Sequence, residues 1–123
     1  MTRRSASSGA PWEATVGYSR AVRVGNTIVV AGTTAPGDDA YAQTKAALAI
    51  IERALVELGA TMGDVVRTRM FVVNMADADA VGRAHGEAFA AIRPSATMVE
   101  VRRLISPELL VEIEVDAIVD EST

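Results

Sequence analysis

The stretch from residue 40 to residue 58 constrains the fold most, because it predicts one helix with a single apolar stripe. Its apolar side chains recur at spacings of three and four residues, which is the period of an α-helix: Ala47, Leu48, Ile51, Ala54, Leu55 and Leu58. Gly59 follows, and glycine commonly ends helices in the left-handed conformation. A helix of this kind buries one side only, so the rest of the chain is expected to supply a packing partner.

A second helix is predicted over residues 76 to 91. Asp77 and Asp79 stand near its start, where the positive end of the helix dipole favours carboxylates. Arg93-Pro94 ends it, because the residue before a proline is disfavoured in the α conformation. Its expected contact positions are Ala80, Val81, Ala84, Ala88 and Phe89.

Five strands are predicted around these helices. Residues 18–24 and 27–31 form an expected hairpin about Gly25-Asn26, and strands follow over residues 64–74, 97–104 and 110–119. The order ββαβαββ predicts an α+β sandwich, in which a mixed sheet carries both helices on one face. Residues 1–123 are expected to form a single domain, with residues 1–10 as a flexible tail.

The second face of the predicted sheet has no helix to cover it. Strand residues such as Val99, Val101, Ile113 and Val115 therefore predict self-association.

Composition excludes several classes of function. The net charge of −4 disfavours a nucleic-acid partner, which would call for a basic face. The absence of cysteine removes disulfides, thiolate nucleophiles and cysteine-based metal sites. No segment resembles a signal peptide or the ~20 apolar residues of a membrane span, so a cytoplasmic protein without membrane contact is expected. No phosphate-binding loop, GxSxG motif or histidine pair for metal is present.

Short motifs stand in order along most of the chain. They are Gly17 to Asn26, Val30-Ala31-Gly32, Gln43 to Leu48, Leu58-Gly59-Ala60, Asp64 to Thr68, Val99-Glu100-Val101 and Leu110 to Glu114. In order and spacing, over residues 11–119, they resemble the YjgF/Rid (reactive intermediate deaminase) family. The resemblance implies a chorismate-mutase-like fold and a homotrimer with its sheets inside. It also implies three clefts between subunits that bind a small molecule.

The same resemblance implies an activity. The best-known members hydrolyse imines and enamines, such as 2-iminopropanoate, to the ketoacid and ammonia without a cofactor or metal. In them an arginine just after the Arg-Pro step grips the substrate carboxylate, and a glutamate on the last strand positions water. The arginine falls on Ala96, the glutamate on Glu112 and a first-strand tyrosine on Tyr18. A methyl group cannot grip a carboxylate as a guanidinium does, so this chain departs from the family at its substrate anchor.

Three residues are candidates for catalysis. Glu112 could serve as a general base toward water, or it could be an exposed carboxylate on a strand edge. His85, the only histidine, could act as acid or base, or could lie on the surface of its helix. Arg69 shares a strand face with Arg67 and could replace the missing anchor, or it could pair with a carboxylate such as Glu114 or Glu100.

Four further positions are candidates for substrate binding beside Ala96. Tyr18 could hold a ligand through its hydroxyl or cap a subunit interface. Gly32 and Thr33 could present backbone N–H groups to an anion, although glycine is equally expected where a strand ends sharply. Met98 is expected to point the same way as Ala96 and to line the cleft.

Two functions are consistent with these residues. The first is a cleft enzyme that adds water to an imine, an enamine or a related electrophile without the usual arginine. The alternative is a non-catalytic trimer that binds a small molecule or stabilises other proteins. A ribonuclease activity, a label given to some relatives, is disfavoured by the acidic composition.

Overall fold

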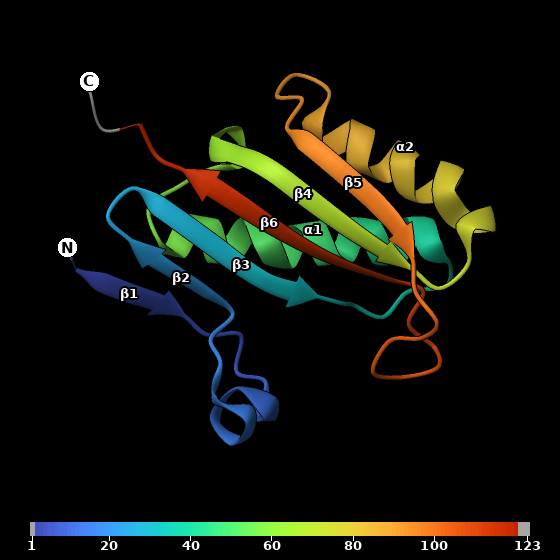
Figure 1. Cartoon of the computed structure of the whole chain (residues 1–123), viewed down its shortest axis with the longest axis horizontal. Coiled ribbons are helices and arrows are strands. Elements are labelled where there is room, and N and C mark those ends of the chain that lie inside the picture. The colour runs from blue at the N-terminus through green and yellow to red at the C-terminus, as the bar shows by residue number, and fades with distance from the viewer. Residues whose placement is uncertain (1, 121–123) are drawn as a thin grey trace.

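One six-stranded mixed sheet organises the chain (Figure 1), as seen in a computed structural model that describes residues 2–120. The strand order is β1-β2-β3-β6-β4-β5, and all neighbours are antiparallel except β4 and β5, which are parallel. The strands are β1 (Arg3–Ala6), β2 (Ala21–Val24), β3 (Thr27–Thr33), β4 (Val65–Val72), β5 (Ser95–Glu100) and β6 (Val111–Ile118). The predicted α+β class with a mixed sheet is confirmed.

Two helices, α1 (Ala40–Glu57) and α2 (Ala78–Phe89), pack behind the sheet as Figure 1 is viewed. The side chain of Asp39 accepts a hydrogen bond from the Ala42 backbone N–H at 2.8 Å and so caps the start of α1. Gly59 has φ 84°, the left-handed conformation expected after the helix. Three single turns complete the chain: η1 (Glu13–Gly17), a π-helical turn, and the 3₁₀ turns η2 (Met62–Asp64) and η3 (Met75–Asp77).

The N-terminal segment corrects the prediction of a flexible tail. Residues Arg3 to Ala6 form β1, which pairs antiparallel with β2 from Arg3 opposite Val24 to Ala6 opposite Ala21. Only Ala6 of the four is buried, so the pairing rests on the backbone ladder. A strand of four residues with one apolar contact carries no periodic signal, which explains why the sequence pattern did not predict it.

Alternation along β6 divides its side chains between the two faces of the sheet. Val111, Ile113, Val115 and Ala117 are fully buried beneath the helices, whereas Glu112, Glu114 and Asp116 lie on the other face, called here the open face. The expectation that Ile113 and Val115 lie on an uncovered surface is therefore wrong. Strand pattern fixes which residues share a face but not which face meets the helices. The apolar side chains that the open face exposes on β2, β3 and β6 are Val24, Val29 and Ile118.

Gln43 ties α1 to the connection that enters β6. Its side chain is buried, and its Nε2 donates to the carbonyl oxygens of Gly37 at 3.2 Å and Glu108 at 3.0 Å. Its Oε1 accepts from the Leu110 backbone N–H at 2.8 Å. One polar side chain therefore forms hydrogen bonds with backbone groups of two loops, which lack the regular backbone hydrogen bonds of a helix or sheet.

Replacing Gln43 with leucine should lower the free energy of unfolding by about 3 kcal/mol, because backbone groups of both loops lose their partners. Urea unfolding followed by circular dichroism measures the change. Thr44→Val is the matched control: Thr44 is equally buried, but its hydroxyl donates to Ala40 O within the same helix at 2.8 Å. That control should cost clearly less, and equal losses in the two variants would contradict the role assigned to Gln43.

Candidate functional site

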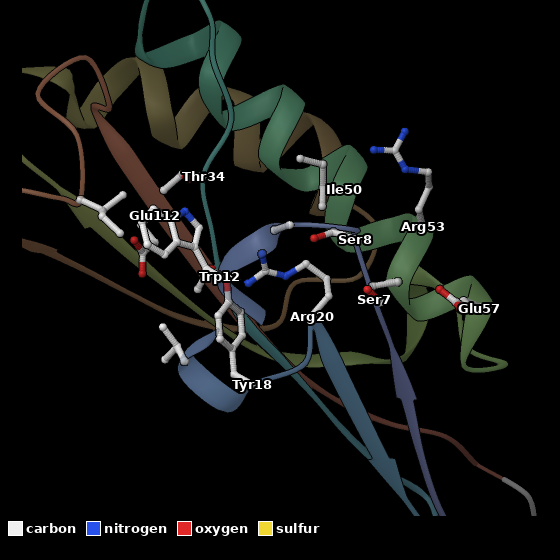
Figure 2. A pocket seen from close by; sticks show the side chains of 15 residues that line it. Ser7, Ser8, Trp12, Tyr18, Arg20, Thr34, Ile50, Arg53, Glu57 and Glu112 are labelled. Carbon is white, nitrogen blue, oxygen red and sulfur yellow. Dashed lines mark hydrogen bonds between the residues drawn. The ribbon is translucent and has the colours of Figure 1, made fainter. Parts of the chain in front are cut away.

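A cavity of about 790 Å³ opens beside the end of β3, between the N-terminal segment and α1 (Figure 2). Tyr18, Arg20, Gly32 and Glu112 supply the wall formed by the sheet and its approaches. The other walls come from the N-terminal segment, from α1 and from the connection after β5, through Trp12, Val16, Ile50, Arg53, Ala54, Glu57 and Ile105. Ionisable side chains therefore share the cavity with a broad apolar surface.

Glu112 is a half-buried carboxylate that lies over the backbone of β3. A Cβ atom added to Gly32 would lie only 2.1 Å from Glu112 Oε2, so the absence of a side chain at Gly32 makes room for this carboxylate. Burial raises the pKa of Glu112 above its ordinary value, the negative charge of Glu114 adds to this rise, and the Arg20 guanidinium opposes it. The arrangement gives a carboxylate that takes up a proton more readily than an exposed glutamate does.

Arg20 is the cation that opposes the rise in the pKa of Glu112, and the residue pattern did not single it out. Its side chain is 9% exposed, and its Nη2 donates to the Gly32 carbonyl oxygen at 2.7 Å. The guanidinium carbon lies 5.7 Å from the centre of the Tyr18 ring, and Figure 2 shows the two side chains pointing toward each other. The only available signal was an arginine two residues after Tyr18, which is not distinctive alone.

The N-terminal segment forms one wall of the cavity because a local hydrogen-bond cluster folds it back. Glu13 Oε2 accepts hydrogen bonds from the Ser8 backbone N–H at 3.0 Å and the Ser8 hydroxyl at 2.6 Å. These bonds from Ser8 hold the pKa of the Glu13 carboxyl below its ordinary value. The π-helical turn η1 follows, and Tyr18 N–H donates to Glu13 O at 3.0 Å. Trp12 and Tyr18 are thereby brought to the same cavity.

His85 lies on the opposite side of the sheet from Glu112. Its Nε2 is 2.9 Å from the hydroxyl oxygen of Thr68, a buried residue on the helix-covered face of β4, and its ring packs 4.7 Å from the Phe89 ring centre. Burial lowers the pKa of His85, so its neutral form is favoured. The structure does not bring His85 to the cavity.

Arg69 is held on the open face by two carboxylates of β6. Its Nη1 is 3.1 Å from Glu114 Oε1 and 3.5 Å from Asp116 Oδ2. Of the two interpretations of Arg69, the geometry supports the one in which it pairs with Glu114. Arg69 does not line the cavity.

The remaining predicted positions separate into two groups. Gly32 lines the cavity, while the side chain of Thr33 is fully buried and donates to Ala31 O at 2.8 Å, leaving Thr34 in the lining. Ala96 and Met98 lie on β5, at the far edge of the sheet from β3, and do not line the cavity of their own chain. Ala96 is exposed, and Met98 packs partly against the core.

Residues 2–120 offer neither a metal site nor a membrane-spanning helix. Within residues 2–120 no group of three or more metal-ligating side chains comes together. In the same part of the chain, no helix combines the length and the apolar character required to cross a lipid bilayer.

Comparison with known proteins gives a consistent result. The family model described as Endoribonuclease L-PSP matches residues 8–119. The crystal structure of Rv2704 from Mycobacterium tuberculosis, described as a member of the YjgF/YER057c/UK114 family, is 56% identical and has a TM-score of 0.94 over 96% of this chain and 100% of its own. Protein SCO2049 of Streptomyces coelicolor is 43% identical over 93% of this chain and 90% of its own length. A RutC family protein of Pyrococcus abyssi, PYRAB12510, is 34% identical over 79% of this chain and 82% of its own.

Gly32→Ala should leave the fold intact but displace the Glu112 carboxylate, because the new methyl group needs the space that Oε2 occupies and a flexible side chain gives way first. The apparent pKa of Glu112, followed by NMR through its side-chain carboxyl carbon, should fall toward the ordinary value as the group moves into water. Gly82→Ala, in a helix with open space around it, is the matched control and should leave that pKa unchanged. An unchanged Glu112 pKa in Gly32→Ala would contradict this account.

The raised pKa of Glu112 also predicts a pH-dependent effect on stability. Below the ordinary glutamate pKa of about 4.3 the carboxyl is protonated in both the folded and unfolded states, so burial costs no charge desolvation. As pH rises through the folded-state pKa, the folded protein must hold a charge that the unfolded chain exposes to water, and stability falls. Glu112→Gln should therefore melt at a higher temperature than the parent protein at pH 7, with the difference vanishing near pH 4. Thermal melts across this range measure it, and a difference that grows toward low pH would have the wrong sign.

Proposed function

The chain belongs to the Endoribonuclease L-PSP family, which is the YjgF/Rid family, and on that premise we propose that its cavity binds a small electrophile and adds water to it. The observation that carries the proposal is the Glu112 carboxylate, half-buried over Gly32 in the same cavity as Tyr18. Glu112 and Tyr18 are the positions to which the resemblance assigns the water-positioning glutamate and the ligand-facing tyrosine.

The proposed reaction is hydrolysis of an imine or of the enamine that interconverts with it. Glu112 accepts a proton from water while the water oxygen bonds to the imine carbon, and the C=N π electrons move to nitrogen, which takes a proton from solvent. The protonated Glu112 then gives its proton to the amine nitrogen of the carbinolamine. The C–N bond breaks to release ammonia, the carbinolamine oxygen becomes the carbonyl oxygen, and its proton passes to solvent. A base with a pKa above that of an exposed carboxyl lies closer to the operating pH, which favours the proton transfer. The chemistry requires no metal or cofactor.

We further propose that the chain assembles as a homotrimer through its open face. That face carries exposed Val24, Val29 and Ile118 together with the Arg69 ion pairs, a surface suited to burial against copies of itself. The cavity would then be completed by a neighbouring subunit. By the family resemblance, the β5 edge of one copy, which carries Ala96 and Met98, would then approach Glu112 of another.

Two other functions compete with this proposal. A trimer that binds a small molecule without turning it over would use the same cavity and would explain the alanine at position 96. Ribonuclease activity, suggested by the family's description, is supported less well because a chain with a net charge of −4 attracts a polyanion poorly. Measurable hydrolysis of an imine distinguishes the proposed enzyme from the non-catalytic binding trimer.

Glu112→Gln should lower the rate of imine hydrolysis at least about 100-fold, because the general base is lost while the shape of the side chain is kept. Imines generated in situ from several amino acids by an amino-acid oxidase serve as substrates, and ammonia release above the buffer rate is measured. Glu114→Gln, two residues along on the same strand, is the control and should retain most activity. Light scattering should give both variants the mass of a trimer. Equal turnover in Glu112→Gln and the parent would remove the role of Glu112, and no turnover with any imine would favour the binding protein.

A further inference from the structure

The Arg20 guanidinium is a buried cation whose hydrogen-bonding capacity is largely unused. Its Nη2 donates to the Gly32 carbonyl oxygen, and its Nε, which is shielded from solvent, has no partner within residues 2–120. Among the same residues it forms no ion pair, although Arg69 and Lys45 do. A guanidinium offers five N–H donors, so most of them remain available for a group that enters the cavity.

Leaving such a charge uncompensated is costly. A buried ion without a counter-ion loses its hydration and gains little in return, so proteins seldom retain one without a compensating partner. Glu13 and Glu112 act on Arg20 only at longer range, since neither forms an ion pair or a hydrogen bond with it among the described residues. A counter-charge in direct contact with the guanidinium is best supplied by a ligand.

The backbone of Arg20 is fixed before any ligand arrives. Its N–H donates to Ala6 O at 2.9 Å, and its carbonyl oxygen accepts from Ala31 N–H at 2.9 Å, so the residue is held between β1 and β3. The side chain is pinned at Gly32 and packed on Tyr18. A preorganised cation loses little conformational entropy when it binds an anion.

We propose that Arg20 is the anion-binding residue of this cavity and that its ligand is a carboxylic acid with an apolar tail. The carboxylate would lie against the guanidinium, and the tail would lie on the apolar lining formed by Trp12, Ile50 and Ala54. The proposal rests on the proposed function in so far as the cavity must bind a small molecule. Under this proposal the anion binds to the subunit that also supplies Glu112. Ala96, the position of the family's arginine, lies instead on β5, the edge strand farthest from β1.

The second arginine of the cavity supplies a control. Arg53 lies on the outer part of α1 and is exposed, and Figure 2 shows its guanidinium pointing away from Tyr18 and Glu112. Glu57, one turn further along α1, is also exposed. The charges of these two residues are well hydrated, so they contribute little to selecting an anion.

Calorimetric titration with phenylacetate and with phenylacetamide, its neutral counterpart, tests the proposal. The parent protein should bind the acid at least about tenfold more tightly than the amide, as expected for a charge-assisted bond to a buried guanidinium. Arg20→Gln should lose this preference, Arg20→Lys should keep a weakened one because it retains charge without the planar fork, and Arg53→Gln should keep it fully. The parent's preference for acid over amide stands as a test even if Arg20→Gln fails to fold.

Several results would overturn the proposal: equal binding of acid and amide by the parent protein, no binding of the acid, or a preference that survives in a folded Arg20→Gln variant.

Phenylacetate is unreactive, so its binding does not depend on catalysis. Glu112→Gln should bind phenylacetate at least as tightly as the parent, because a like charge near the ligand is removed. A protein that shows this binding pattern but hydrolyses no imine would contradict the proposed function and leave the role of Arg20 supported.

Discussion

The alternation of β6 between two environments is the constraint on which the rest of the structure depends. A central strand with neighbours on both sides has no freedom to rotate, so the burial of Val111, Ile113, Val115 and Ala117 beneath the helices forces Glu112, Glu114 and Asp116 onto the open face. A register shift of one residue would bury three carboxylates and expose the core. The position of Glu112 is thus secured by the same packing that stabilises the sheet.

Glu112 differs from the other two acids of β6 through its neighbours. Glu114 and Asp116 both lie within reach of Arg69, which compensates their charges. Glu112 lies opposite Phe71 in the sheet and over Gly32, and within residues 2–120 it forms no ion pair with a cation. Three acids with the same strand geometry therefore divide into two structural ion-pair partners and one carboxylate left available for a ligand or for water.

The features predicted from sequence are those whose signal extends over many residues. The α1 stripe spans five turns and is bounded by the Asp39 cap and Gly59, so its predicted end lies within one residue of the observed one. The end of α2 is less regular: the helix stops at Phe89, and Arg93 takes φ 56° before Pro94, although residues before proline favour the extended conformation. The strand β1 and the turn η1 depend on pairing with β2 and on the Ser8 to Glu13 hydrogen bonds, which no local period reveals.

The arginines show why site prediction stops earlier than fold prediction. Arg20, Arg23 and Arg69 all flank or occupy strands, and nothing in the residue pattern ranks them. The surroundings of the three arginines distinguish them. Arg23 donates to the Leu58 carbonyl oxygen at the end of α1, and Arg69 pairs with acids of β6, so both have structural partners. Arg20 is as buried as Arg23 yet retains a donor that no described residue satisfies. Burying a charged group without a partner costs free energy. The unsatisfied donor of Arg20 therefore identifies it as the one of these three cations that is suited to bind a ligand.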